Sequence, residues 1–344
     1  MKVRPEVEAM TGYVPGAQPA HDRPIIKLNT NESPLPPSPK VMEAITAVSA
    51  EQLRRYPEPS SKKFREAAAN LHGVSPEQII TGNGSDDILT ILTRTAIGEG
   101  GRIASPWPTY SLYPTLTEIQ GATLKQVPWL DGWQLPVDYL LASEADAIYL
   151  ANPNAPSGTL SATADLERLI DAVPGIVLID EAYADFDHIS AVPLIRDNVL
   201  ISRTLSKGYG LAGLRFGYAI GPVELIEQMH KVRDSYNCDA VAQTAATAAI
   251  LDQDYAEATW TLVREQRDRL TSKLTEIGFE LTDSHANFVF ARHAEAERVF
   301  NELRDRDILI RYWPGGDLSE WIRITVGTRE QNDALLDAIK SIVS

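Results

Sequence analysis

The chain has 344 residues, 44% of them hydrophobic and 23% charged, and a formal net charge of −15 at pH 7. This composition is typical of a globular protein with a sizeable core, and the acidic balance argues against a nucleic-acid partner, because phosphate contacts need a basic surface. A single cysteine excludes a disulfide framework, and the scattered spacing of the six histidines argues against a metal site. The sequence has no long apolar run and no apolar signal core, which predicts a cytoplasmic protein.

The first hundred residues predict a proline-rich arm followed by an alternating strand and helix pattern. In the arm, a short apolar run at 25–28 indicates a strand, and apolar residues at helical spacing follow Ser38. Residues 78–81 indicate a second strand, which a glycine-rich turn at 82–87 joins to a helix. Because the N–H groups at a helix N-terminus bind anions, this turn is a candidate anion site. The alternative is that Ser85 serves only as an N-cap.

The middle of the chain predicts a mostly parallel α/β sheet. Apolar runs alternate with helical segments; they lie at about 101–106, 122–128, 147–151, 175–179, 199–201 and 216–220, with a helix expected at 163–172. Strands that are apolar throughout are typical of parallel sheets with both faces covered. Ligands of such sheets bind beyond the carboxyl ends of the strands. The residues that fall at that edge are Asn152, Asn154, Asp180, Tyr183 and Lys207.

The stretch 204–218 places Lys207 among small residues and Arg215 eight positions later. A lysine that loses water is shifted toward its neutral, nucleophilic form. The planar fork of an arginine matches the oxygens of a phosphate group. A lysine beside a phosphate-binding arginine is what a pyridoxal phosphate (PLP) site requires. The alternative is a surface loop that carries two unrelated cations.

The last third of the chain predicts a second, smaller α+β domain. Residues 223–250 indicate helices and 254–276 a long amphipathic helix that connects the domains. Strands are expected at 279–281, 287–290, 308–313 and 321–326, and helices at 294–306 and 329–343. We therefore expect an N-terminal arm with part of the small domain at 1–48, a large domain at 49–250 and a small domain at 251–344.

A series of motifs in this chain resembles the fold-type-I PLP-dependent aminotransferases, and within them the histidinol-phosphate aminotransferases. The motifs lie at 28–34, 55–59, 82–86, 180–183, 204–207, 211–215 and 322–327, so the resemblance covers nearly the whole chain. It implies a mostly parallel central sheet with helices on both faces, PLP as cofactor and a homodimer. It also implies reversible transamination between L-histidinol phosphate and 2-oxoglutarate in histidine biosynthesis, in a ping-pong sequence through pyridoxamine phosphate.

The resemblance implies a role for each residue of the cofactor site. Lys207 would bind the cofactor covalently and move the proton, Asp180 would pair with the pyridine nitrogen, and Tyr183 would bind the ring oxygen O3′. Tyr110 would stack on the ring, although packing is the alternative for such an aromatic residue. The remaining cofactor-binding candidates are Ser85, Asp86, Ser206 and Arg215 around the phosphate, Thr204, Asn154, and Tyr56 from the neighbouring subunit.

For the substrate, the resemblance implies that Arg323 binds either a carboxylate or a phosphate, because one guanidinium fork suits both. Other candidates for this pocket are Tyr13, Asn31, Asn152, Tyr236, Asn237 and Arg311; for Arg311 the alternative is a strand residue that faces solvent. The chain departs from the family at Ala155, where many relatives have an asparagine that touches O3′. Asn154 or Asn152 could take over that contact.

Related activities on the same scaffold remain as alternatives. They are the transamination of an aromatic amino acid and the decarboxylation of phosphothreonine. A non-catalytic regulator with a PLP-enzyme fold is the alternative from another class. Such a regulator needs a DNA-binding domain, and no basic helix-turn-helix is present in the chain.

Overall fold

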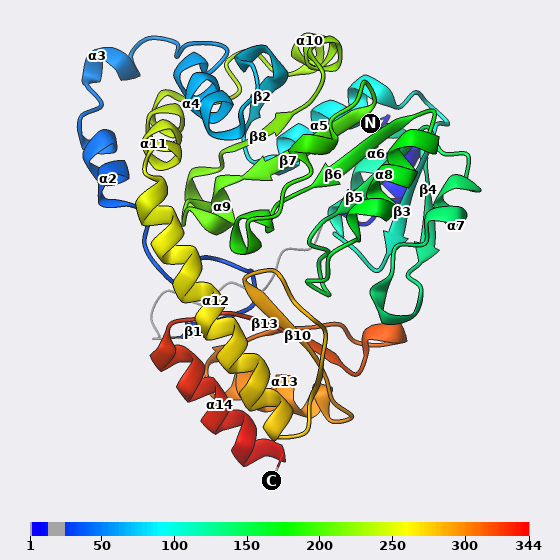
Figure 1. Cartoon of the computed structure of the whole chain (residues 1–344), viewed down its shortest axis with the longest axis vertical. Helices are drawn as coiled ribbons and strands as arrows, with labels where there is room; N and C mark the ends of the chain where they lie inside the picture. Colours follow the sequence, from blue (N-terminus) through cyan, green and yellow to red (C-terminus); the bar gives the residue numbers. More distant parts are fainter. Residues whose placement is uncertain (1, 13–24, 344) are drawn as a thin grey trace.

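A seven-stranded sheet forms the centre of the computed structural model, which describes residues 2–12 and 25–343 (Figure 1). Its strand order is β2-β8-β7-β6-β5-β3-β4, and β8 alone among these strands runs opposite to the other six. The strands are β2 (Ile79–Gly82), β3 (Arg102–Trp107), β4 (Thr123–Pro128), β5 (Ala147–Ala151), β6 (Ile176–Asp180), β7 (Val199–Thr204) and β8 (Gly217–Ile220). The predicted mostly parallel sheet is confirmed.

Helices cover both faces of this sheet, as predicted. They are α4 (Lys62–His72), α5 (Ser85–Ala96), α6 (Leu112–Gln120), α7 (Val137–Leu141), α8 (Thr163–Ala172), α10 (Val223–Val232) and α11 (Ala240–Leu251). Neighbouring residues of one strand pack into different cores: Ile148 lies in the core that includes α8, and Tyr149 lies in the core that includes α5. Both faces are therefore buried, which explains why the strands are apolar throughout.

The C-terminal part of the chain forms a second sheet below the first one in Figure 1. Its four antiparallel strands, in spatial order, are β12 (Arg311–Tyr312), β13 (Trp321–Thr325), β10 (Phe288–Arg292) and β9 (Glu280–Leu281). The helices of this part are α12 (Gln253–Glu276), which runs from one sheet region to the other, α13 (Ala296–Asp305) and α14 (Arg329–Val343). The predicted antiparallel sheet with two helices is present, and the domain boundaries at 48 and 250 remain a proposal.

The N-terminal arm crosses from one region to the other. It contains α1 (Pro5–Ala9), β1 (Ile26–Lys27) and α2 (Pro39–Thr46), and α3 (Ala50–Leu53) follows it. Strand β1 pairs in parallel with β11 (Ile308–Leu309), so the single strand predicted at 308–313 is divided: its first half pairs with the arm and its second half pairs with β13. None of the helices described in residues 2–12 and 25–343 has the length and apolar character needed to cross a membrane.

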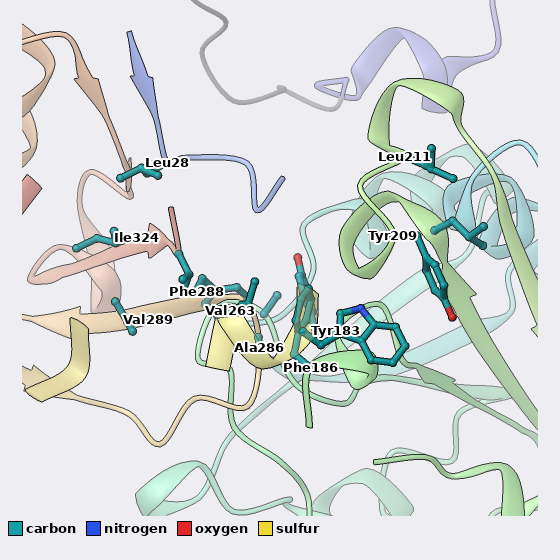
Figure 2. Close-up of a cluster of buried hydrophobic side chains, with 14 of the residues drawn as sticks. Leu28, Tyr183, Phe186, Tyr209, Leu211, Val263, Ala286, Phe288, Val289 and Ile324 are labelled. Atoms are coloured by element: carbon teal, nitrogen blue, oxygen red, sulfur yellow. The ribbon is translucent and has the colours of Figure 1, made fainter. Parts of the chain in front are cut away.

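One buried apolar cluster joins the two regions (Figure 2). Tyr183 and Phe186 contribute to it from the loop after β6, and Phe288 and Ile324 contribute from the second sheet. The rings of Tyr183 and Phe288 meet edge to face with their centroids 5.1 Å apart. Because this cluster packs the small sheet against the loop after β6, it places both sheets beside a common cavity.

Candidate active site

A cavity of about 880 Å³ lies at the carboxyl ends of β5, β6 and β7, and residues of β12 and β13 form another part of its wall. The position follows from topology, because parallel strands present their carboxyl ends at one edge of a sheet. The predicted site residues that line the cavity are Asn31, Ser85, Asp86, Tyr110, Asp180, Tyr183, Thr204, Ser206, Lys207, Arg215, Arg311 and Arg323. The expected common edge is therefore present in the folded chain.

Lys207 lies on a single helical turn, α9 (Leu205–Gly208), directly after β7. The Thr204 side chain accepts from the backbone N–H of Ser206 at the start of this turn. Lys207 Nζ donates to the carbonyl oxygen of Thr30 at 2.8 Å. Burial, and next the charge of Arg323, lower the pKa of Lys207 to about 8. A substantial fraction of this amine is therefore neutral near physiological pH and can act as a nucleophile or base.

Asp180 is buried at the end of β6 and has two hydroxyl donors. Ser202 Oγ donates to it at 2.9 Å and Tyr113 Oη at 3.1 Å. Burial raises the pKa of Asp180 to about 6, although both hydrogen bonds oppose this shift. The carboxylate is thus mostly charged at pH 7 in a place that penalises its charge. Such a group is stabilised by a cation brought close to it, for example a protonated ring nitrogen.

The N-terminus of α5 and the Arg215 side chain form an anion cradle. Gly84 precedes the helix and Ser85 is its first residue, with no side-chain cap within the described residues, so the alternative role of Ser85 as N-cap is wrong. Arg215 lies 3.4 Å from Ser206 Oγ and 3.1 Å from Asp86 Oδ2. A Cβ at Gly84, where φ is 85°, would be 2.6 Å from the Arg215 guanidinium. The glycine therefore allows the guanidinium to approach the helix N-terminus closely.

The Tyr110 ring lines the cavity, and its hydroxyl donates to Asp86 Oδ1 at 2.9 Å. Across the cavity, the Tyr183 hydroxyl accepts from Asn31 Nδ2 at 2.9 Å. Asn31 is itself fixed, because its N–H donates to Thr325 Oγ1 at 2.9 Å and its carbonyl accepts from Asn287 Nδ2 at 3.0 Å. Asn31 therefore connects Tyr183 to the small sheet.

Arg311 and Arg323 are direct partners across β12 and β13. Directly opposite residues of an antiparallel pair project from the same face, and both side chains line the cavity. The alternative that Arg311 faces only solvent is therefore wrong. Arg323 Nη2 donates to the carbonyl of Asn29 at 3.2 Å, and its guanidinium lies 5.2 Å from the centre of the Phe288 ring. Two adjacent guanidinium groups suit a ligand with a carboxylate or a phosphate.

The structure does not bring the two asparagines of the loop after β5 to the cavity, in contrast to the prediction. Asn154 is fully buried and donates to Ser157 Oγ at 2.9 Å. Asn152 Oδ1 accepts from the backbone N–H of Ser161 at 2.9 Å. Their amides stabilise the loop itself, whereas Ala155 lines the cavity. The amide that bonds to the Tyr183 hydroxyl comes from Asn31.

The remaining predicted residues also lie away from the cavity of the single chain. Asn237 Nδ2 donates to the carbonyl of Thr81 at 3.0 Å, so its amide is used within the fold. Tyr56 is 81% exposed and stacks on Tyr236 with ring centroids 4.5 Å apart. Neither tyrosine lines the cavity. Tyr13 lies outside the described residues.

Several residues that hold the site together were not predicted. Tyr113 lies on α6, a helix that was not predicted; its Pro114 lies in the first helical turn, where proline is tolerated. Ser202 precedes Thr204 by two positions on β7 and pairs with Asp180, so strand periodicity could have identified it. Trp313 also lines the cavity, two residues after Arg311.

The cavity fits a flat, phosphorylated aromatic aldehyde such as PLP. Lys207 offers an amine, Asp180 offers a buried carboxylate, and the N-terminus of α5 with Arg215 offers an anion site within the same cavity. The arginine pair on the small sheet offers a second anion site. The arrangement can therefore hold a charged cofactor and a separate anionic substrate at the same time.

Residues 23–339 match the family described as aminotransferase class I and II. A histidinol-phosphate aminotransferase of Trichormus variabilis is 44% identical over 99% of this chain and 98% of its own length. A histidinol-phosphate aminotransferase of Rhodopirellula baltica is 43% identical over 98% of this chain and 94% of its own length.

Two solved structures place the fold among known enzymes. Histidinol-phosphate aminotransferase from Sinorhizobium meliloti, solved in complex with pyridoxal 5′-phosphate, superposes with a TM-score of 0.91 and 26% identity over 99% of this chain and 97% of that one. A variant of Thermus thermophilus aspartate aminotransferase superposes with a TM-score of 0.84 and 22% identity over 99% of both chains, which shows the shared fold alone.

Proposed function

The chain belongs to the aminotransferase class I and II family, and on that premise we propose that it transfers the amino group of L-histidinol phosphate to 2-oxoglutarate, and the reverse, with PLP as cofactor. The observation that carries this proposal is the identity of 40–45% to histidinol-phosphate aminotransferases along nearly their full length. The predicted fold-type-I architecture agrees with the same comparison. The reaction belongs to histidine biosynthesis.

The cofactor would be held by residues at or after the ends of β6 and β7, by Arg215 before β8 and by the N-terminus of α5. Its phosphate would bind at the first residues of α5 with Arg215 and Ser206, where a helix N-terminus and a guanidinium meet. Asp180 would pair with the ring nitrogen, which relieves the cost of its buried charge. Tyr183 would bind the ring hydroxyl oxygen, held in place by Asn31. Lys207 would hold the cofactor covalently through Nζ.

PLP supplies an electron-withdrawing ring system that stabilises negative charge at the substrate Cα when it is bound. The chain would supply the proton transfer: Lys207 Nζ would take the proton from the substrate Cα and deliver it to the cofactor carbon C4′, because its lowered pKa makes a substantial fraction of the amine neutral. Asp180 keeps its negative charge because Ser202 and Tyr113 both donate to it. Arg323 and Arg311 bind the anionic end of the substrate and so fix the distance between Cα and Lys207.

A spectroscopic experiment tests the proposed substrate. The purified enzyme with PLP is mixed with L-histidinol phosphate and no keto acid, and we expect the visible absorption band of the lysine-bound cofactor to disappear. Addition of 2-oxoglutarate should restore the band, which identifies both half-reactions. A band that ignores histidinol phosphate but responds to an aromatic amino acid or to phosphothreonine would assign one of the alternative activities to this fold.

The pKa of Lys207 predicts how the rate of cofactor capture depends on pH. Only the neutral amine can attack the cofactor aldehyde, so the capture rate of the apoenzyme should rise with pH around a midpoint near 8. Stopped-flow absorbance after mixing with PLP between pH 6.5 and 9.5 measures it. The charge of Arg323 contributes to the lowered pKa, so Arg323→Gln should move the midpoint upward. An unchanged midpoint in this variant would contradict the electrostatic explanation.

We propose further that the enzyme is a homodimer and that Tyr56 completes the phosphate site of the partner subunit. Tyr56 is the most exposed of the large apolar residues described, and Met42 and Leu53, on the neighbouring helices α2 and α3, are also exposed. Exposed apolar residues gathered on one part of a surface favour a protein interface. A tyrosine with its hydroxyl outside its own cavity is consistent with a role in another subunit. The cytoplasmic location expected from the sequence is part of the same proposal, and cell fractionation would test it.

We expect Tyr56→Phe to weaken PLP binding about 10-fold, because one hydrogen bond to a charged group is lost. The dissociation constant is measured by dialysis and absorbance, and Tyr139→Phe, another exposed tyrosine, is the matched control. Mixed dimers distinguish the subunits: one subunit carries Tyr56→Phe and the other carries Lys207→Ala. Normal PLP binding at the intact Lys207 is expected if Tyr56 acts across the interface, and weak binding there would overturn the cross-subunit role.

A further inference from the structure

The Trp313 ring lies close to both arginines of the cavity wall. Trp313 follows β12 and lines the cavity itself. The Arg311 guanidinium lies 5.6 Å from the centre of the indole ring, and the Arg323 guanidinium lies 5.7 Å from it. Both distances are within the range at which a ring face attracts a cation. One aromatic side chain thus contacts both cations.

This contact opposes a repulsion that the strand register creates. Arg311 and Arg323 are paired directly across β12 and β13, and like charges in that position destabilise a sheet. Arg323 is also fixed from another direction, because its guanidinium lies 5.2 Å from the centre of the fully buried Phe288 ring. Arg311 has no such second ring among the described contacts, so Trp313 is the aromatic contact that keeps Arg311 beside Arg323.

The chemistry of the two substrates makes this arrangement selective. A phosphate monoester carries a charge of about −1.5 to −2 at pH 7 and has three acceptor oxygens, whereas a carboxylate carries a single charge and has two. One guanidinium fork satisfies a carboxylate. A second guanidinium beside the first adds more to the binding of a phosphate than to the binding of a carboxylate.

We propose that Trp313 is a specificity-determining residue, which holds Arg311 beside Arg323 and so favours a substrate that ends in a phosphate monoester over one that ends in a carboxylate. The inference rests on the proposed function, since it concerns the choice between histidinol phosphate and glutamate at the same site. It assigns the preference to an indole ring that binds no substrate charge itself.

The test compares kcat/KM for histidinol phosphate and for glutamate in three variants of the PLP-loaded enzyme. In Trp313→Leu, kcat/KM for histidinol phosphate should fall about 10-fold further than kcat/KM for glutamate, mainly through KM, because both cation–ring contacts are lost. Trp313→Phe keeps a ring and should restore most of the ratio. Trp133→Leu is the matched control, because Trp133 and Trp313 both contact the Phe290 ring but Trp133 does not line the cavity. Its loss should leave the ratio at the wild-type value.

The outcomes separate this inference from the proposed function. Equal losses for both substrates in Trp313→Leu, or a loss of the ratio in Trp133→Leu as large as in Trp313→Leu, would overturn the role of Trp313. A loss confined to kcat would overturn it as well, since a binding preference acts on KM. Failure of the proposed function has a different signature, namely a wild-type enzyme that does not turn over histidinol phosphate.

Discussion

Lys207→Ala should lower transamination by at least about 10⁴-fold, because one side chain supplies both the covalent attachment and the proton transfer. The structure gives Lys207 a lowered pKa of about 8 and places it in the same cavity as Asp180 and Arg215. A water molecule cannot replace an amine that is held in position at this point of the wall. PLP itself should still bind to the variant without a covalent link, since Asp180 and the α5 N-terminus remain.

Two measurements check this prediction. Turnover is followed with histidinol phosphate and 2-oxoglutarate, and the intact mass is determined after borohydride reduction of the PLP-loaded protein. We expect no cofactor mass on Lys207→Ala. The control is Lys27→Ala. Lys27 is also partly buried and donates to the hydroxyl of Thr30, but it does not line the cavity. Turnover by Lys207→Ala, or a reduced adduct on it, would refute the assignment of the cofactor lysine.

Asp180→Asn is expected to lower kcat by about 10²–10³-fold, the cost of removing one preorganised charge from a buried site. Asparagine has nearly the same shape; its amide oxygen can accept from one of the two hydroxyls and its NH2 group can donate to the oxygen of the other, so packing should change little. What the variant loses is the negative charge that favours a protonated ring nitrogen. The affinity for PLP should fall for the same reason.

Thermal stability provides an independent readout, because Asp180 has opposite effects with and without cofactor. The pKa of Asp180 in the folded apoenzyme, about 6, lies above the ordinary value of 3.8. Its charge therefore begins to cost stability as the pH rises above about 4, and the cost is complete above about 6. Apo Asp180→Asn should therefore be at least as stable as the apo wild type at pH 7, with the advantage fading as the pH falls from about 6 to about 4. With PLP bound the order should reverse.

The control for this comparison is Asp138→Asn, the same chemical change at an exposed position of α7. It should alter neither the apoenzyme nor the stabilisation by PLP by a comparable amount. If apo Asp180→Asn melts well below the apo wild type and gains as much as the wild type from PLP, then Asp180 has a structural role rather than a role as the charge partner of the cofactor.

The strands and the edge at which the site forms could be predicted from the sequence, for a local reason. Residues 147–151 and 175–179 are apolar throughout because helices cover both faces of the sheet, and that burial is written in residue type alone. Once the strands are recognised as parallel, Asp180 and Lys207 must lie at the same edge, because Asp180 ends β6 and Lys207 lies on the helical turn directly after β7. The motifs supplied the remaining assignment, since their order along the chain is specific to one family.

The direction of each side chain at that edge was decided only by the tertiary structure. Asn154 and Tyr183 follow neighbouring strands, yet Asn154 is fully buried within its own loop, whereas Tyr183 lines the cavity. The partner of the Tyr183 hydroxyl is Asn31, which the distant arm supplies. The pairing of Arg311 with Arg323 likewise depends on how a predicted strand divides between two sheets. The sequence by itself determined the strands, the fold class and the chemistry available at the carboxyl edge, because these follow from residue type and local periodicity. Long-range pairing and packing, which no local pattern encodes, decided which of those side chains meet in the cavity.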